Sequence, residues 1–270
     1  MKRLIMLLAL AMFVLSGCSD NAESTPEEKK QVDLKVASLI PPMTDILEIA
    51  KPLMKEEGIN LEIVVLGDNI QPNNALANKE VDANFFQHKP FMEQYNESNG
   101  TELVRVEPIY HAIFGAYSKK YKTMDELPEG ATIAIPNDQI NLARSLVMFA
   151  DQGIIKLKDG VGLKATQADI VENVKNYKFK EVDLLMLARM MDDADLVTLY
   201  PSYAEPLGLK PSKDAVITEN VNSTFAISLV ARKDNAKSEA IQLLAEKMTG
   251  PEVKKFLEEN FADTSLPAFD

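Results

Sequence analysis

The 270-residue sequence predicts an α/β fold with two lobes and a ligand cleft between them. Three observations carry this prediction. Strand-like and helix-like patterns alternate from residue 34 to residue 100, the alternation restarts near residue 131, and the chain ends in helical patterns. Such alternation is typical of parallel α/β packing. A cleft between two lobes of this kind is a preferred place for a small ligand.

The N-terminal residues indicate where the protein is sent. A short basic start precedes an apolar run over residues 4–15, which has the length of a signal-peptide core and is too short to span a bilayer. The run ends in Leu-Ser-Gly-Cys, and Cys18 is the only cysteine of the chain. This pattern is typical of a bacterial lipobox, although an ordinary signal peptide with a chance cysteine is the alternative. We expect a signal peptide over 1–17 and lipidation of Cys18.

The segment that follows the cysteine is polar and contains a proline, so we expect a flexible tether over 18–32. The protein should therefore sit on the extracytoplasmic face of the cell membrane, anchored by lipid. Its net charge of −12 argues against binding nucleic acid. A lipidated Cys18 leaves no thiol, and the two histidines form no metal-binding motif. We therefore predict no catalytic residue, no metal and no cofactor.

The first lobe begins with a buried strand. Two prolines follow it, and a helical pattern then runs to Gly58 with Pro52 as an expected kink or break. The alternation continues for two more strands. The predicted strands are 34–40, 61–66 and 81–86, and the predicted helices are 44–57, 72–79 and 89–99.

The second lobe restarts the alternation after a turn-rich connector, and the C-terminal helices return to the first lobe. Further strands are predicted at 131–135, 179–182, 196–200 and 225–231, with helices at 139–152 and at 237–261, the latter broken at Gly250-Pro251. We assign residues 33–117 and 225–270 to the first lobe and 118–224 to the second.

Residues 135–146, IPNDQINLARSL, join a strand end to a helix start. Backbone N–H groups at a helix start favour an anion. Asn141 and Arg144 lie three residues apart and share one helix face, and an arginine can hold a carboxylate with two parallel hydrogen bonds. The segment is either a receptor for a ligand carboxylate or a capped helix whose arginine pairs with an acid of the protein.

Residues 81–91, VDANFFQHKPF, end a strand in aromatic side chains and open a helix. Residues at the carboxyl ends of parallel strands line the cleft of open α/β sheets. Phe86, His88 and Phe91 could therefore form an apolar wall with one polar contact. The alternative places Phe85 or Phe86 in the core and makes His88 a helix cap or a surface residue.

These blocks, together with AYSKKYKTMDELPEGATIAIPND and GIIKLKDGVGL, resemble the methionine-binding lipoprotein family of the NlpA type. The resemblance covers residues 34–234 in the family's order, behind a lipobox. It implies the two-lobed, periplasmic-binding-protein-like (type II) fold. It also implies the extracytoplasmic receptor of an ABC importer, with no enzymatic activity.

The resemblance also implies site residues. Phe86 and His88 match the family's aromatic wall and its polar contact to the ligand. Asn141 and Arg144 match the positions that hold the ligand's carboxylate end. These matches favour the receptor interpretation of the arginine.

Four pocket positions depart from the family's pattern. Asn69 and Phe91 stand where the family usually has tyrosines. Tyr200 and Ile227 fall where the family has asparagines that bind the amino-acid head group. Without those amides a buried ligand ammonium would be poorly paired. The ligand is thus predicted to be methionine or a related amino acid, a derivative or a short peptide.

The expected partners are this small amino-acid-like ligand, an ABC permease with its ATPase, and the membrane, and we expect a monomer. Two alternatives belong to other classes. One is a surface lipoprotein with an adhesion or signalling role, and the other is an anchored enzyme acting on amino acids. Stabilisation by a ligand would separate a receptor from an adhesin.

Overall fold

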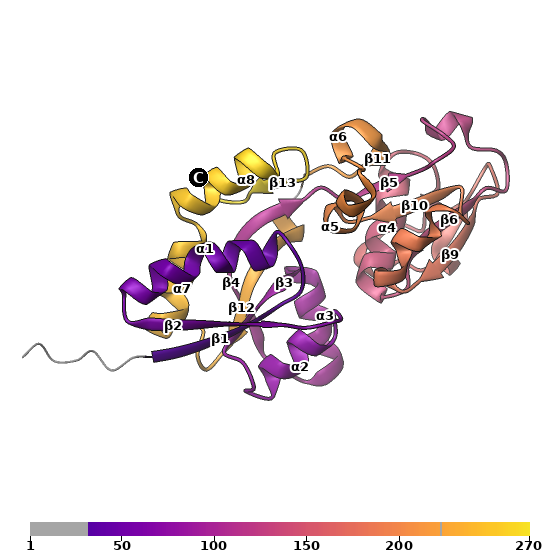
Figure 1. Cartoon of the computed structure of the whole chain (residues 1–270). Coiled ribbons are helices and arrows are strands. Elements are labelled where there is room, and N and C mark those ends of the chain that lie inside the picture. The colour runs from indigo at the N-terminus through magenta and orange to yellow at the C-terminus, as the bar shows by residue number, and fades with distance from the viewer. Residues whose placement is uncertain (1–31, 222) are drawn as a thin grey trace, which may run out of the picture. The chain divides into compact units, whose positions relative to one another are not determined.

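The computed structural model describes residues 32–221 and 223–270 (Figure 1). The predicted signal peptide, Cys18 and nearly all of the tether lie outside these residues. Two mixed sheets organise the described chain. Six strands, in the order β13-β4-β12-β3-β1-β2, form the first sheet. Their bounds are β1 Val32–Ser38, β2 Ile59–Val65, β3 Ala83–His88, β4 Leu103–Ala112, β12 Ala226–Arg232 and β13 Ser265–Pro267.

The first half of this sheet is parallel, as the alternation predicts. Strand β1 pairs in parallel with both β2 and β3, so the chain crosses over in opposite directions through α1 and α2. Right-handed crossovers then place these two helices on opposite faces of the sheet. Strand β12 is antiparallel to β3 and β4. The helices that pack on this sheet are α1 Met43–Glu56, α2 Gln71–Ala77, α3 Lys89–Asn99, α7 Glu239–Met248 and α8 Pro251–Asn260.

The second sheet has five strands in the order β11-β5-β10-β6-β9. They are β5 Gly115–Tyr117, β6 Thr132–Pro136, β9 Lys178–Val182, β10 Leu196–Leu199 and β11 Ala215–Thr218. Helix α4 Gln139–Asp151 follows β6, and the short helices α5 Pro201–Ala204 and α6 Pro211–Asp214 precede β11. A small hairpin pairs β7 Lys156–Leu157 with β8 Ile170–Glu172.

Six 3₁₀ segments complete the described elements, of which η4 is the longest with eight residues. They are η1 Met124–Glu126, η2 Gly162–Lys164, η3 Gln167–Asp169, η4 Leu184–Met191, η5 Glu205–Leu207 and η6 Ser223–Phe225.

The predicted elements are found within a few residues of their expected ends, and the break at Gly250 between the two C-terminal helices is confirmed. Two differences have physical reasons. Helix α1 continues through Pro52, whose ring lies on the exposed side, while the opposite face buries Ile46 and Ala50 in the core. Packing of that apolar face offsets the hydrogen bond that the proline removes.

The second difference is strand β4, for which the sequence analysis predicts no element. Its residues alternate poorly, and Pro108 interrupts the run, but β4 lies between β12 and β13 and pairs with both. Strand β5 then belongs to the second sheet. A division that follows the sheets therefore lies between Ala112 and Gly115, a few residues before position 117. The two-lobe boundaries themselves stay a prediction.

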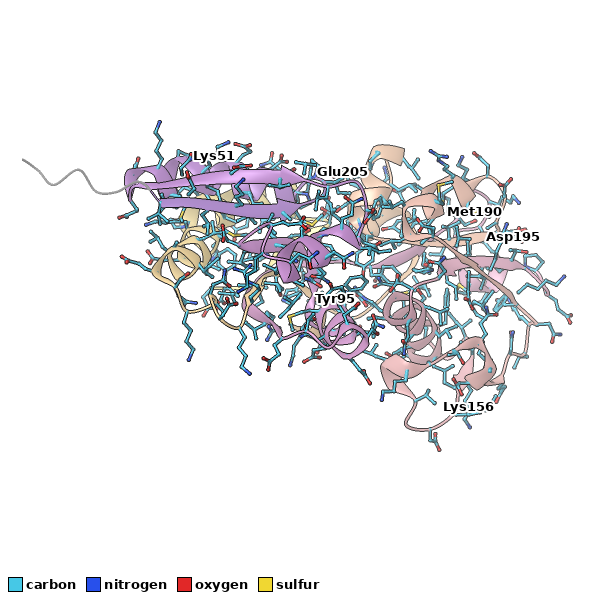
Figure 2. The ribbon with its side chains drawn as sticks, turned by 90° about the horizontal axis from the view of Figure 1, so that it is seen from below. Lys51, Tyr95, Lys156, Met190, Asp195 and Glu205 are labelled. Carbon is cyan, nitrogen blue, oxygen red and sulfur yellow. The ribbon has the colours of Figure 1, made fainter. Side chains whose placement is uncertain are left out.

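The core is apolar on both sheets, and most charged side chains lie outside, with Arg144 as a buried exception. Val36, Phe85 and Leu229 are buried in the first sheet, and Ile133 and Leu196 in the second. Figure 2 shows charged side chains such as Lys51, Lys156 and Glu205 on the exterior. Across the residues that the structure describes, no helix is both long and apolar enough to cross a membrane.

Candidate ligand-binding site

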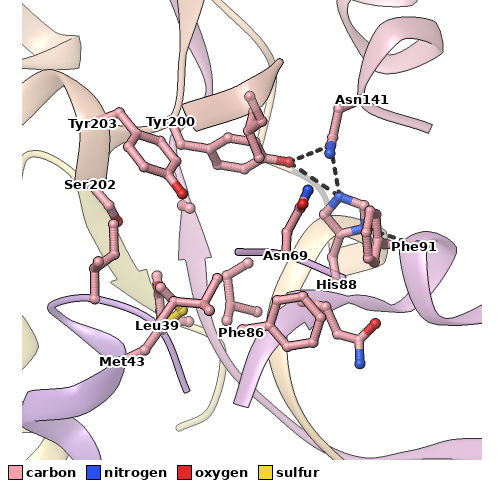
Figure 3. A pocket seen from close by; sticks show the side chains of 16 residues that line it. Leu39, Met43, Asn69, Phe86, His88, Phe91, Asn141, Tyr200, Ser202 and Tyr203 are labelled. Atoms are coloured by element: carbon pink, nitrogen blue, oxygen red, sulfur yellow. Dashed lines mark hydrogen bonds between the residues drawn. The ribbon is translucent and has the colours of Figure 1, made fainter. Parts of the chain in front are cut away.

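One cavity gathers the carboxyl ends of strands from both sheets. Leu39 follows β1, His88 ends β3, and Tyr200 follows β10 (Figure 3). Asn141 enters from the first turn of α4, which follows β6. The cavity volume is about 50 Å³, and on the same measure one water needs about 10–15 Å³. The lining residues are Leu39, Ile40, Met43, Asn69, Phe86, Gln87, His88, Phe91, Tyr110, Ala112, Asn141, Leu184, Tyr200, Ser202, Tyr203 and Ile227.

His88 is a helix cap and a pocket residue at once. Its Nδ1 accepts the backbone N–H of Phe91 at 3.3 Å, which starts α3. Because Nδ1 is an acceptor, the neutral ring carries its proton on Nε2. Burial, aided by the positive charge of Arg144, lowers the pKa of His88 to about 3. The imidazole is therefore neutral at physiological pH and offers one N–H at the polar end of the pocket.

Asn141 is fixed by the cap of α4. The carboxylate of Asp138 accepts the backbone N–H of Asn141 at 3.0 Å and its side-chain N–H at 3.0 Å. This directs Asn141 Oδ1 toward the pocket, where it lies 3.2 Å from His88 Nε2. Burial raises the pKa of Asp138.

The hydroxyl of Tyr200 joins these groups. It donates to Asn141 Oδ1 at 2.6 Å and accepts Arg144 Nη1 at 2.7 Å. It also lies 3.2 Å from His88 Nε2 (Figure 3). Burial raises the pKa of Tyr200, which keeps the phenol protonated. Four side chains thus form one closed hydrogen-bonded cluster at the end of the cavity.

Arg144 is the member of this cluster that does not line the cavity, and it is 2% exposed. Its Nε donates to Glu219 at 2.8 Å, and its Nη2 donates to the other carboxylate oxygen of the same residue. The guanidinium carbon lies 4.1 Å from the ring centroid of Phe225 and 5.0 Å from that of Phe114. The arginine therefore has a bidentate acidic partner and aromatic faces inside the protein.

Most of the remaining wall is apolar. Phe86 and Phe91 meet edge to face at 5.9 Å between ring centroids, and Met43, Leu184 and Ile227 complete the surface. Phe85, one residue away on β3, points to the opposite face and is fully buried in the core. The alternation of the strand thus assigns one phenylalanine to the core and the next to the pocket.

The structure brings most of the predicted site residues into this one cavity. Its lining includes Asn69, Phe86, His88, Phe91, Asn141, Tyr200 and Ile227. Arg144 does not line it. For the arginine, the geometry favours the alternative in which it pairs with an acid of the protein, and contact with a ligand carboxylate stays a prediction. For His88, the cap and the pocket interpretations hold together.

The sequence analysis did not find several residues of the site. Glu219 is 75 positions from Arg144, and no local pattern connects them. Ser202 and Tyr203 enter from the short helix after β10. Gln87 lines the cavity, but its amide is bonded to Asn73 and Asn84. The strand-end rule could have indicated Tyr203, because Tyr200 and Tyr203 follow the same strand.

The described residues contain no cluster of histidine, cysteine and acidic side chains able to hold a metal ion. The arrangement suits binding: an apolar wall, a polar end fixed from two sheets, and a small enclosed volume.

Comparisons with known proteins find relatives over nearly the whole described chain. The profile described as NlpA lipoprotein matches residues 34–269. A D-methionine-binding lipoprotein of Salmonella typhimurium is 37% identical over 247 residues, which are 90% of this chain and 89% of that protein.

Two solved structures are similar over the same region. A nutrient binding protein from Burkholderia cenocepacia, bound to methionine, is 34% identical with a TM-score of 0.84, covering 87% of this chain and 100% of that one. An ABC transporter periplasmic substrate-binding protein from Coxiella burnetii is also 34% identical, with a TM-score of 0.83 and the same coverages.

Proposed function

Because the chain belongs to the NlpA lipoprotein family, we propose that it captures methionine or a closely related compound and delivers it to an ABC importer. The family consists of solute-binding lipoproteins and not of enzymes, and it implies a lipid anchor on a membrane. The finer assignments are part of the proposal. They are an anchor at Cys18, a position on the extracytoplasmic face, and a permease with its ATPase as partners.

One observation carries the ligand part of the proposal. The cavity at the strand ends joins an apolar wall of Phe86, Phe91 and Ile227 to a polar end at His88 and Asn141. A thioether chain suits the apolar wall, since sulfur contacts aromatic rings favourably. The Burkholderia protein, similar over nearly this whole chain, is bound to methionine.

The test is ligand binding by the purified protein. Calorimetry and thermal unfolding should be measured against L-methionine, D-methionine, methionine derivatives, methionine dipeptides and unrelated amino acids. We expect a rise in Tm for one methionine-related compound, because a ligand that binds only the folded state stabilises it. We expect L-methionine itself to bind more weakly than to relatives that keep both asparagines. If no compound of the panel raises Tm, the proposed import function is wrong.

A further inference from the structure

The polar end of the cavity is already filled by the protein's own hydroxyl group. A tyrosine hydroxyl has one donor and two acceptor sites. In Tyr200 the donor goes to Asn141, and the acceptor sites face Arg144 and His88 at 2.7 Å and 3.2 Å. Two of these partners, Arg144 and His88, direct N–H donors at the phenol oxygen as they would at a ligand oxygen. The phenol oxygen therefore occupies the place of such an oxygen.

In the part of the chain that the structure describes, the polar end of the cavity offers no unpaired charged side chain to a ligand. Of the described residues that line the cavity, none is Asp, Glu, Lys or Arg, and His88 is the only one that could carry a positive charge. Buried Nδ1 of His88 already accepts a backbone N–H, so the ring stays neutral. The charge of Arg144 is paired within the protein: its Nε and Nη2 donate to Glu219, and its Nη1 donates to Tyr200.

The open polar groups are also uncharged. Within the described part of the chain, the side chains of Asn69, Ser202 and Tyr203 make no hydrogen bond, and all three line the cavity (Figure 3). They can satisfy an amide, a hydroxyl or an ester. A carboxylate or an ammonium placed there would be buried without a counter-ion, which is strongly unfavourable.

We propose that the ligand is an uncharged, methionine-sized thioether without a free carboxylate, and that Tyr200 excludes the amino-acid head group. This inference rests on the proposed function for its thioether part and goes beyond it in the charge of the ligand. Tyr200 acts in two ways: its ring takes up the head-group space, and its hydroxyl engages the N–H groups of Arg144 and His88 that face the cavity end.

Three probes separate charge from shape. The first two, 3-(methylsulfanyl)propanamide and 3-(methylsulfanyl)propanoate, have nearly the same shape and differ in charge, and the third is L-methionine. Their dissociation constants should be measured by calorimetry or ligand-observed NMR at pH 7. We expect the wild-type protein to bind the amide at least tenfold more tightly than the propanoate and than L-methionine.

Two substitutions at one position test the cause. Tyr200→Phe removes only the hydroxyl and leaves Arg144 Nη1 without this acceptor, so the amide-to-propanoate preference should fall about tenfold. Tyr200→Asn also removes the ring and should bring a gain in affinity for L-methionine. Tyr117→Phe is the matched control: Tyr117 is buried outside the cavity lining, and within the described residues its hydroxyl makes no hydrogen bond, so the ratio between the two probes should stay at the wild-type value. Apo Tm values report whether each variant is folded.

The outcomes are distinct. Wild-type protein that binds L-methionine more tightly than the amide overturns this inference and leaves the proposed function in place. An unchanged ratio in folded Tyr200→Phe also overturns it. If neither the wild-type protein nor the variants bind any probe, both the inference and the methionine-related function fail.

Discussion

Arg144 offers a quantitative test of how this site is built. The sequence alone leaves two roles for it, a receptor for a ligand carboxylate or a partner for an acid of the protein. In the structure its side chain is 1% exposed and that of Glu219 is 13% exposed, and the two form a bidentate pair. Arg144→Ala removes the guanidinium and leaves the carboxylate of Glu219 largely buried.

The expected cost follows from this geometry. Removing one member of a buried ion pair destabilises a protein by about 3–5 kcal/mol, because the remaining charge is desolvated without compensation. Loss of the contact to the Phe225 ring, 4.1 Å away, adds to this cost. For a domain of this size, 1 kcal/mol shifts Tm by about 2–4 °C. We therefore expect the apo protein to lose about 6–20 °C.

The assay is thermal and denaturant unfolding of the apo protein, with ligand affinity measured beside it. Arg144→Lys should recover only part of the loss, because an ammonium cannot reproduce the planar fork. A double variant with methionine at both positions, Arg144→Met and Glu219→Met, should be more stable than Arg144→Ala, since it leaves no unpaired charge. A variant Arg144→Ala that unfolds within about 1 kcal/mol of wild type, yet loses tenfold or more in ligand affinity, would refute this reasoning and restore the receptor role.

Three further predictions concern other parts of the chain. Cys18→Ala should prevent lipidation, so fractionation should find the protein released or retained as uncleaved precursor; normal processing with membrane retention would contradict the lipobox. Folding lowers the pKa of His88 from 6.5 to about 3, so the unfolded chain takes up a proton first as the pH drops. The free energy of unfolding should therefore fall by about 1.4 kcal/mol per pH unit between pH 6.5 and pH 3. His88→Asn, which keeps a capping residue, should lose this part of the pH dependence when urea titrations are repeated at each pH. Gly115→Ala would place a Cβ 3.0 Å from the carbonyl oxygen of Ile217 and should lower the free energy of unfolding by about 1–3 kcal/mol. Gly67→Ala is the control, because its Cβ would have nothing within 4 Å, and its free energy of unfolding should stay within about 0.5 kcal/mol of the wild-type value.

The α/β class and most elements could be predicted because they depend on local signals. Helix α3 illustrates this: a strand of buried residues ends at His88, Pro90 opens the helix, and Gly100 closes it with φ 64°. Each signal acts within a few residues. Strand β4 could not be predicted in this way. Its identity depends on partners from the C-terminal part of the chain, β12 and β13, and no local pattern specifies them.

The cavity was predictable to the same extent. Side chains at the carboxyl ends of parallel strands line the cleft of open α/β sheets. Phe86 and His88 on the first sheet and Tyr200, which follows a strand of the second, could therefore be expected to face the cleft. Which atoms face the ligand could not be expected, because it depends on pairs far apart in sequence. The bond from Arg144 to Glu219 spans 75 positions, and that from His88 to Tyr200 spans 112.

The hydrogen-bond capacity of the site, and not only the identity of its residues, determines what the site can hold. His88, Asn141 and Arg144 are the residues that the family resemblance assigns to the ligand, and all three are present. A fourth residue, Tyr200, engages an atom of each of them. If the ligand is inferred from the identity of these residues alone, the prediction is a zwitterionic amino acid. If it is inferred from the donors and acceptors that Tyr200 already engages, the prediction is a neutral ligand. The two predictions differ in the sign of one measured preference, that between a thioether amide and its carboxylate.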